Sequence, residues 1–154
     1  MPTPQVRMHA YERLHAEISR IEPGCRSAFI DLAWEHLQTT GVSWIGFYDL
    51  ASDETEMILG PCQNRPACSP IGMHGACGQA LKSGKTLIVD DVADLGDAYV
   101  ACDPSDLSEI VIPIGNDHAR SVLDLDSQDP ASFGPEDDFW LKKCLLKARI
   151  EANG

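Results

Sequence analysis

Residues 42–50 read VSWIGFYDL, a run of aromatic and β-branched residues that is typical of a buried strand. A polar turn follows, and residues 56–59 are expected to return as the second strand of a hairpin. Gly60-Pro61 is expected to end that strand. A loop to about residue 73 would then contain Cys62 and Cys68.

The same pattern recurs towards the C-terminus. Residues 109–114 and 119–126 predict a second hairpin around a Gly-Asn-Asp turn, and residues 86–89 predict a short strand before it. A short helix is expected over residues 75–81, stopped by Gly84. Residues 90–107 are acidic and contain proline, which predicts a loop.

Helices are expected at both ends of the chain. Residues 6–21 and the segment from Cys25 to Leu37 have apolar residues at helical spacing. A last helix should begin after Gly134, because Pro135 and two acids suit the first helical turn. This order predicts an α+β fold in which the helices are segregated to one side of the sheet.

Length and charge narrow the classes of function. The chain has 154 residues, which predicts one domain over residues 1–154 with a core large enough to be stable without disulfide bonds or a structural metal. A net charge of −12 argues against nucleic acid and anionic membranes as partners. No apolar run is long enough to span a bilayer and no secretory signal is visible, so the cytoplasm is the expected location.

In a reducing compartment, cysteines are expected to be free, catalytic or metal-binding. Cys102 lies in a loop, where catalytic groups are often mounted, although a small buried side chain there is an equally good interpretation. Cys68 is the better candidate for a resolving thiol, and Cys62 is close enough to compete. Cys77 lies near a helix start, which lowers a thiol pKa, but packing against the sheet is the simpler interpretation.

Other cysteine roles are less favoured. Cys25 and Cys144 lie on the apolar stripes of helices and are expected to be packing residues. The intervals between the remaining cysteines are long and uneven, unlike those of structural zinc sites. The sequence therefore predicts no metal and no bound cofactor.

Three acids and two aromatic residues could form a pocket. Asp124 and Asp126 alternate with leucines, so both carboxyls point to one face of a strand, and Glu109 on the adjacent strand could join them. Like charges so close raise one pKa. The alternative is that these acids form a solvent-exposed, charged edge of the sheet and no pocket. Trp44 and Tyr48 share a face across Gly46 and would form either a floor for a small apolar group or ordinary core.

Together these segments resemble the free methionine-(R)-sulfoxide reductases, which are GAF-domain enzymes. The matching segments run in order along nearly the whole chain: SWIGFY (43–48), LGPCQ (59–63), PAC (66–68), GACG (75–78), ACD (101–103), SEIV (108–111) and VLDLDS (122–127). Departures from the usual family pattern occur at Cys62, Asn64, Tyr99-Val100 and Ser121.

The resemblance implies a GAF-like central antiparallel sheet with the N- and C-terminal helices packed on one side. It implies that Cys102 is the nucleophile, with Cys68 as the main resolving thiol and Cys77 as a second candidate.

Glu109, Asp124 and Asp126 would hold the sulfoxide and ammonium ends of free methionine sulfoxide, and Trp44 and Tyr48 would wall the methyl pocket. A homodimer reduced by an external dithiol such as thioredoxin is also implied. The alternative is a non-catalytic GAF-type module that binds a small ligand or senses oxidants.

Overall fold

The computed structural model describes residues 4–98, 105–115 and 119–150. Its helices and strands, in chain order, are α1 (Pro4–Glu17), η1 (Ile18–Arg20), α2 (Arg26–Leu37), β1 (Val42–Leu50), β2 (Glu56–Gln63), β3 (Ile71–Gly72), α3 (Ala76–Ser83), β4 (Leu87–Val89), η2 (Val92–Ala98), β5 (Ser108–Ile114), β6 (Ser121–Ser127) and α4 (Pro135–Lys147).

The strands form one sheet of six in the order β3-β2-β1-β6-β5-β4, and every neighbouring pair is antiparallel. The predicted central antiparallel sheet is therefore confirmed. The expectation that Gly60-Pro61 ends the second strand was wrong, because β2 continues to Gln63. The register of β2 against β1 shifts between Gly46 and Tyr48, which is the signature of a β-bulge. As a result Cys62 belongs to the strand and lies opposite Gly46, not in a loop.

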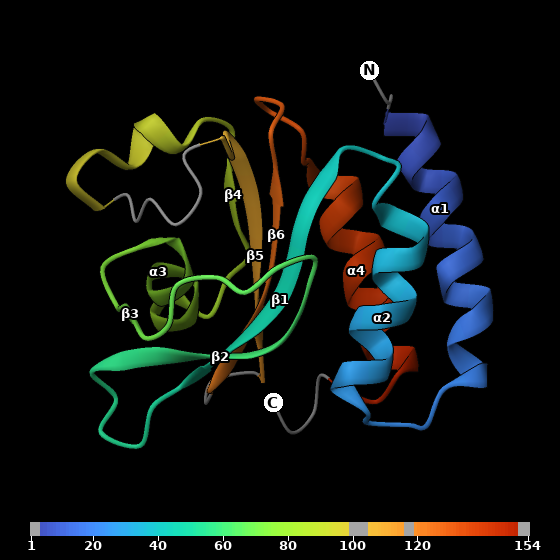
Figure 1. The fold of residues 1–154 in the computed structure, drawn as a ribbon, viewed down its shortest axis with the longest axis horizontal. Coiled ribbons are helices and arrows are strands. Elements are labelled where there is room, and N and C mark those ends of the chain that lie inside the picture. The colour runs from blue at the N-terminus through green and yellow to red at the C-terminus, as the bar shows by residue number, and fades with distance from the viewer. Residues whose placement is uncertain (1–3, 99–104, 116–118, 151–154) are drawn as a thin grey trace.

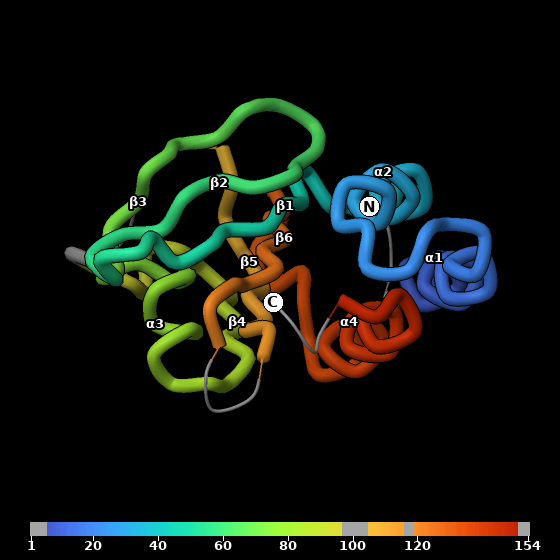
Figure 2. Tube along the Cα trace, turned by 90° about the horizontal axis from the view of Figure 1, so that it is seen from below, coloured from blue at the N-terminus to red at the C-terminus, as the bar shows by residue number. Residues whose placement is uncertain are grey.

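Helices cover both faces of the sheet (Figures 1 and 2). The terminal helices α1, α2 and α4 lie together on one face, as expected, while α3 lies on the opposite face. The prediction of helices on one side therefore holds for the terminal helices but not for α3. Both helix boundaries marked by glycine are confirmed: Gly84 caps α3 in the left-handed conformation, and Gly134 precedes α4.

Each face of the sheet has its own apolar core because side chains alternate along a strand. On the side of the terminal helices, Phe47, Ile112 and Leu123 are buried in the larger core. On the side of α3, Trp44 and Val111 belong to a second, smaller core. The smaller core borders a cavity that acidic side chains also line.

A buried ion pair fastens α1 to α4. Arg7 lies 3.1 Å from Asp137, and their side chains are only 5% and 6% exposed. The hydroxyl of Tyr11, itself fully buried, donates to the same carboxylate at 2.7 Å. Among the helices of the described residues, none combines the length and apolarity needed to cross a bilayer.

Candidate active site

The register of the sheet brings the predicted acids and aromatics to one face. Glu109 on β5 lies directly opposite Asp126 on β6, and Trp44 on β1 lies opposite Asp126 from the other side. Asp124 lies opposite Gly46. Directly opposed residues of antiparallel strands point to the same face with their Cβ atoms about 5 Å apart. The expected shared face of the three acids is therefore confirmed, and it is the face covered by α3.

A cavity of about 80 Å³ lies between this face, α3 and the segments beside it. This is room for roughly five to eight water molecules. It is lined by Trp44, Tyr48, Ala67, Ile71, Gly75, Ala76, Cys77, Val92, Leu95, Asp106, Glu109, Asp124 and Asp126. Each acid and aromatic residue singled out from the sequence thus reaches one cavity.

The acids do not form the solvated edge that was the alternative interpretation. Burial, followed by the charges of Asp126 and Glu109, raises the pKa of Asp124 well above its usual value. Burial also raises the pKa of Glu109 to about 7, helped by the charge of Asp106 and opposed by a hydrogen bond with Asp124. The pKa of Asp126 is raised by burial and by the charges of Glu109 and Asp106. The surroundings therefore favour the protonated form of all three carboxyls, and Glu109 is about half protonated at neutral pH.

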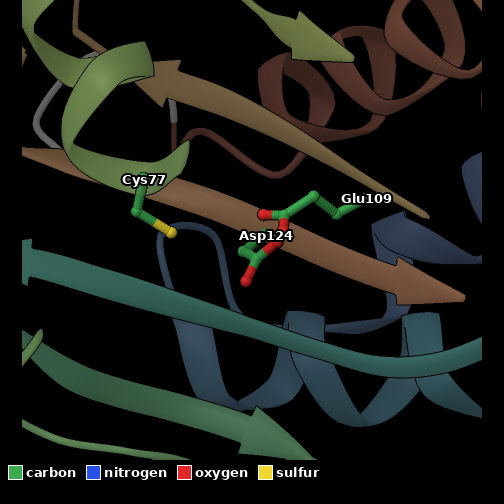
Figure 3. Close-up of side chains that lie close together, drawn as sticks. All are labelled: Cys77, Glu109 and Asp124. Carbon is green, nitrogen blue, oxygen red and sulfur yellow. The ribbon is translucent and has the colours of Figure 1, made fainter. Parts of the chain in front are cut away.

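Cys77 projects from α3 towards Glu109 and Asp124 (Figure 3). It is only 5% exposed, and burial followed by the charge of Asp124 raises its pKa well above that of a free thiol. The expected lowering by the helix start is therefore outweighed, and the packing interpretation of Cys77 holds. Atoms of the three side chains lie within 4.8 Å of one another, close enough to converge on a cation. Shared protons account for the same approach, since protonated carboxyls do not repel each other.

The aromatic wall has a second role as an anchor for the loop that contains Cys68. The rings of Trp44 and Tyr48 lie 6.1 Å apart. The indole N–H of Trp44 donates to the carbonyl of Arg65 at 2.9 Å, and the Tyr48 hydroxyl donates to the carbonyl of Cys68 at 2.8 Å. The two residues that wall the cavity thus hold the loop, and Tyr48 holds the backbone of Cys68 itself.

Gly46 leaves no gap between the two aromatic side chains, because the indole ring of Trp44 occupies the space above it. A Cβ at Gly46 would overlap the indole ring of Trp44 and would lie 2.8 Å from the Cβ of Cys62. The indole therefore folds over the glycine and closes the floor of the cavity. Glycine is required here because another side chain approaches its backbone.

The cysteines differ in state. Cys68 is exposed and disulfide-bonded, whereas Cys25, Cys62, Cys77 and Cys144 are free thiols. Cys144 is fully buried and packs in the larger core, as expected. Cys25 does not pack in the core as expected: it is partly exposed at the N-cap position of α2, where its side chain makes no capping hydrogen bond. Cys102, the predicted nucleophile, lies outside the described residues.

Sequence reasoning missed two contributions to the cavity. Residues 90–107 were expected to be loop, but η2 supplies the apolar side chains Val92 and Leu95. Asp106 also lines the cavity and was not distinguished from the other acids of this acidic segment. Its only sequence signal is its position three residues before Glu109. That spacing does not by itself predict that Asp106 and Glu109 line the same cavity, because this depends on how the chain turns into β5.

No protein-family model matches the chain. The chain is 37% identical over 119 residues to the free methionine-R-sulfoxide reductase of Escherichia coli, an alignment that covers 75% of this chain and 68% of that protein. Aligned segments span 62% to 68% of the length of the curated relatives.

Two solved structures extend the likeness to nearly the whole chain. The free methionine-R-sulfoxide reductase of Neisseria meningitidis, solved in complex with its substrate, superposes with a TM-score of 0.78 at 27% identity, covering 98% of this chain and 92% of that one. A structure described as a GAF domain superposes with a TM-score of 0.78 at 29% identity, covering 100% of this chain and 93% of the other.

Proposed function

The chain belongs to the free methionine-R-sulfoxide reductase family and has the α+β GAF fold, and we therefore propose that it reduces free L-methionine (R)-sulfoxide to methionine by thiol chemistry. The observation that supports this most is the cavity in which the protonated forms of Glu109, Asp124 and Asp126 are favoured beside an aromatic wall. Sulfoxide reduction needs such a site, because the sulfoxide oxygen must be protonated as the sulfur is attacked.

The first half of the reaction uses one thiol and one acid. Cys102 attacks the sulfoxide sulfur, and Glu109, whose pKa of about 7 leaves it half protonated at neutral pH, donates to the oxygen. The attack bonds the Cys102 sulfur to the substrate sulfur, and a second proton on the oxygen lets it leave as water as the S–O bond breaks. Water then adds to the Cys102 sulfur and loses a proton, the S–S bond breaks, methionine leaves as the thioether, and Cys102 is left as a sulfenic acid. Two electrons have then passed from the Cys102 sulfur to the substrate.

The second half restores the thiol. The thiol of Cys68 condenses with the sulfenic acid, releasing water and forming a disulfide. The disulfide-bonded state of Cys68 and the hydrogen bond from Tyr48 to its carbonyl support this role. Cys77 is a weaker candidate, because its raised pKa leaves little thiolate to react. An external dithiol of the thioredoxin type then reduces the disulfide by exchange. This reductant and a homodimeric assembly remain predictions.

The neutral acids also remove a difficulty in this mechanism. Ionised carboxylates beside Cys102 would raise its pKa and deplete the attacking thiolate. Protons retained by Asp124 and Asp126 limit that repulsion. The ammonium group of a free amino acid would limit it further. A methionine inside a peptide has no such group, so the acidic cavity also favours the free amino acid.

Single-turnover chemistry tests the proposal. Methionine released per chain is measured by chromatography, and turnover is measured with thioredoxin, thioredoxin reductase and NADPH. Cys102→Ser should release no methionine, Cys68→Ser about one per chain, and Cys25→Ser should turn over like the wild type because Cys25 lies outside the cavity. Steady-state turnover in Cys102→Ser would refute the mechanism. A wild-type protein that binds the sulfoxide without releasing methionine would instead be the sensor module.

A further inference from the structure

The cavity contains a fourth acid, Asp106, whose side chain is only 13% exposed. Two backbone hydrogen bonds of the next residue, Leu107, hold this part of the chain. The N–H of Leu107 donates to the carbonyl of Ser127 at 2.8 Å, and the carbonyl of Leu107 accepts from the N–H of Val92 at 2.8 Å. The segment is therefore fixed between η2 and β6. A side chain mounted on a backbone fixed in this way is preorganised for binding.

Contacts to Asp106 differ in kind from those of the other acids. The hydroxyl of Ser43 donates to one carboxylate oxygen at 2.8 Å, and the guanidinium of Arg65 lies 3.6 Å from the other. A donated hydrogen bond and a nearby cation both favour an ionised carboxylate. The charge of Asp106 is in turn one reason why the pKa of Glu109 and that of Asp126 are raised.

From this difference between Asp106 and the other three acids we propose that Asp106 is the anionic anchor for the α-ammonium group of a free amino acid substrate. Asp106 would then be a specificity-determining residue. The inference rests on the proposed function and deepens it. Glu109, Asp124 and Asp126 favour protonated forms that a sulfoxide oxygen can use, whereas the Asp106 carboxylate is held by Ser43 and Arg65 and lines the same cavity. A charge-assisted hydrogen bond from an ammonium group is among the stronger polar contacts that a cavity can offer.

A purely structural role for Asp106 predicts a different pattern. If the carboxylate served only to hold Arg65, its loss would disturb the loop beside Trp44 and impair every substrate equally. An ammonium anchor instead acts only on substrates that have an ammonium group. Free methionine (R)-sulfoxide and N-acetyl-methionine (R)-sulfoxide differ in that group alone at the amino end, so the pair separates the two roles.

The test compares both substrates in wild type, Asp106→Asn and Asp106→Ser. For the free amino acid, the loss of a charged contact should raise KM about tenfold to a hundredfold with kcat changed by no more than a few fold. For the N-acetyl compound, kcat/KM should stay within a few fold, so the preference for the free amino acid collapses. Equal loss with both substrates, or an unchanged KM for the free amino acid, would overturn the assignment.

A matched control and a binding measurement complete the test. Arg65→Gln removes the cation but leaves the Asp106 carboxylate in place. It also leaves the backbone carbonyl of residue 65, which accepts a hydrogen bond from Trp44. It should retain the substrate preference, and loss of preference equal to that of Asp106→Asn would contradict the anchor. Calorimetry in the Cys102→Ser background separates the two proposals. If the Cys102→Ser variant binds the free sulfoxide in preference to the N-acetyl form, and this preference is lost when Asp106 is also replaced, Asp106 is the ammonium anchor. That conclusion would hold even if the wild type showed no turnover and the proposed reductase activity were refuted.

Discussion

Replacing Glu109 by glutamine should stabilise the folded protein at pH 8 while removing activity. The pKa of Glu109 rises from 4.5 to about 7 on folding, chiefly through burial. Because the folded-state value lies above the unfolded one, the unfolded chain loses its proton first as the pH rises. Stability from this group is therefore complete below about pH 4.5 and is lost as the pH rises to about 7. Glutamine is neutral throughout and avoids the loss.

The size of the effect follows from the same values. A pKa raised from 4.5 to about 7 corresponds to about 3 kcal/mol in the free energy of unfolding, of which roughly 2 to 3 kcal/mol is lost between pH 5 and pH 8. Its neighbours add to the effect in the same direction. The charge of Glu109 also raises the pKa of Asp124 and that of Asp126, so its removal eases their ionisation as well.

Urea denaturation followed by tryptophan fluorescence, with the protein kept reduced, measures the effect. The quantity of interest is the difference in unfolding free energy between Glu109→Gln and wild type at pH 8, minus the same difference at pH 5. This subtraction cancels every group that the substitution leaves unchanged. Glu12→Gln, at an exposed position on α1, should give a value near zero. A value near zero for Glu109→Gln, or a variant less stable than wild type at pH 8, would refute the reasoning. Turnover should fall about a hundredfold or more, as expected for a lost general acid.

Three further substitutions test other parts of the structure. Gly46→Ala should lower kcat/KM and shift tryptophan fluorescence, because its Cβ would overlap the indole ring that covers it; unchanged kinetics would mean that the ring does not form the floor. Tyr48→Phe removes the hydrogen bond to the Cys68 carbonyl, so the first methionine should be released at the normal rate while disulfide formation, followed by thiol trapping, becomes slower. Asp137→Ala leaves Arg7 buried without its partner and should cost about 3–5 kcal/mol of stability without changing the specific activity of the folded protein; a loss below about 1 kcal/mol in chemical denaturation would contradict this.

Local sequence patterns accounted for most of the fold. The alternation of Leu123 and Leu125 with Asp124 and Asp126 gave the correct face for each side chain, because side chains of a strand alternate whatever its neighbours are. Gly84 and Gly134 marked helix boundaries through backbone preferences that act within one turn. The β-bulge at Gly60-Pro61 was missed, because glycine and proline occur both at strand ends and at bulges, and only the register against β1 distinguishes the two.

The amino-acid sequence by itself therefore determined the types of element, the alternation of their faces and the chemical groups available, all of which depend on interactions over a few residues. Only the tertiary structure decided which groups meet. It placed α3 on the far face of the sheet, set Cys77 against the acids, and turned Asp106 into their cavity. The protonation of the cluster was also decided there, because a pKa depends on burial and on charges brought close by strand register.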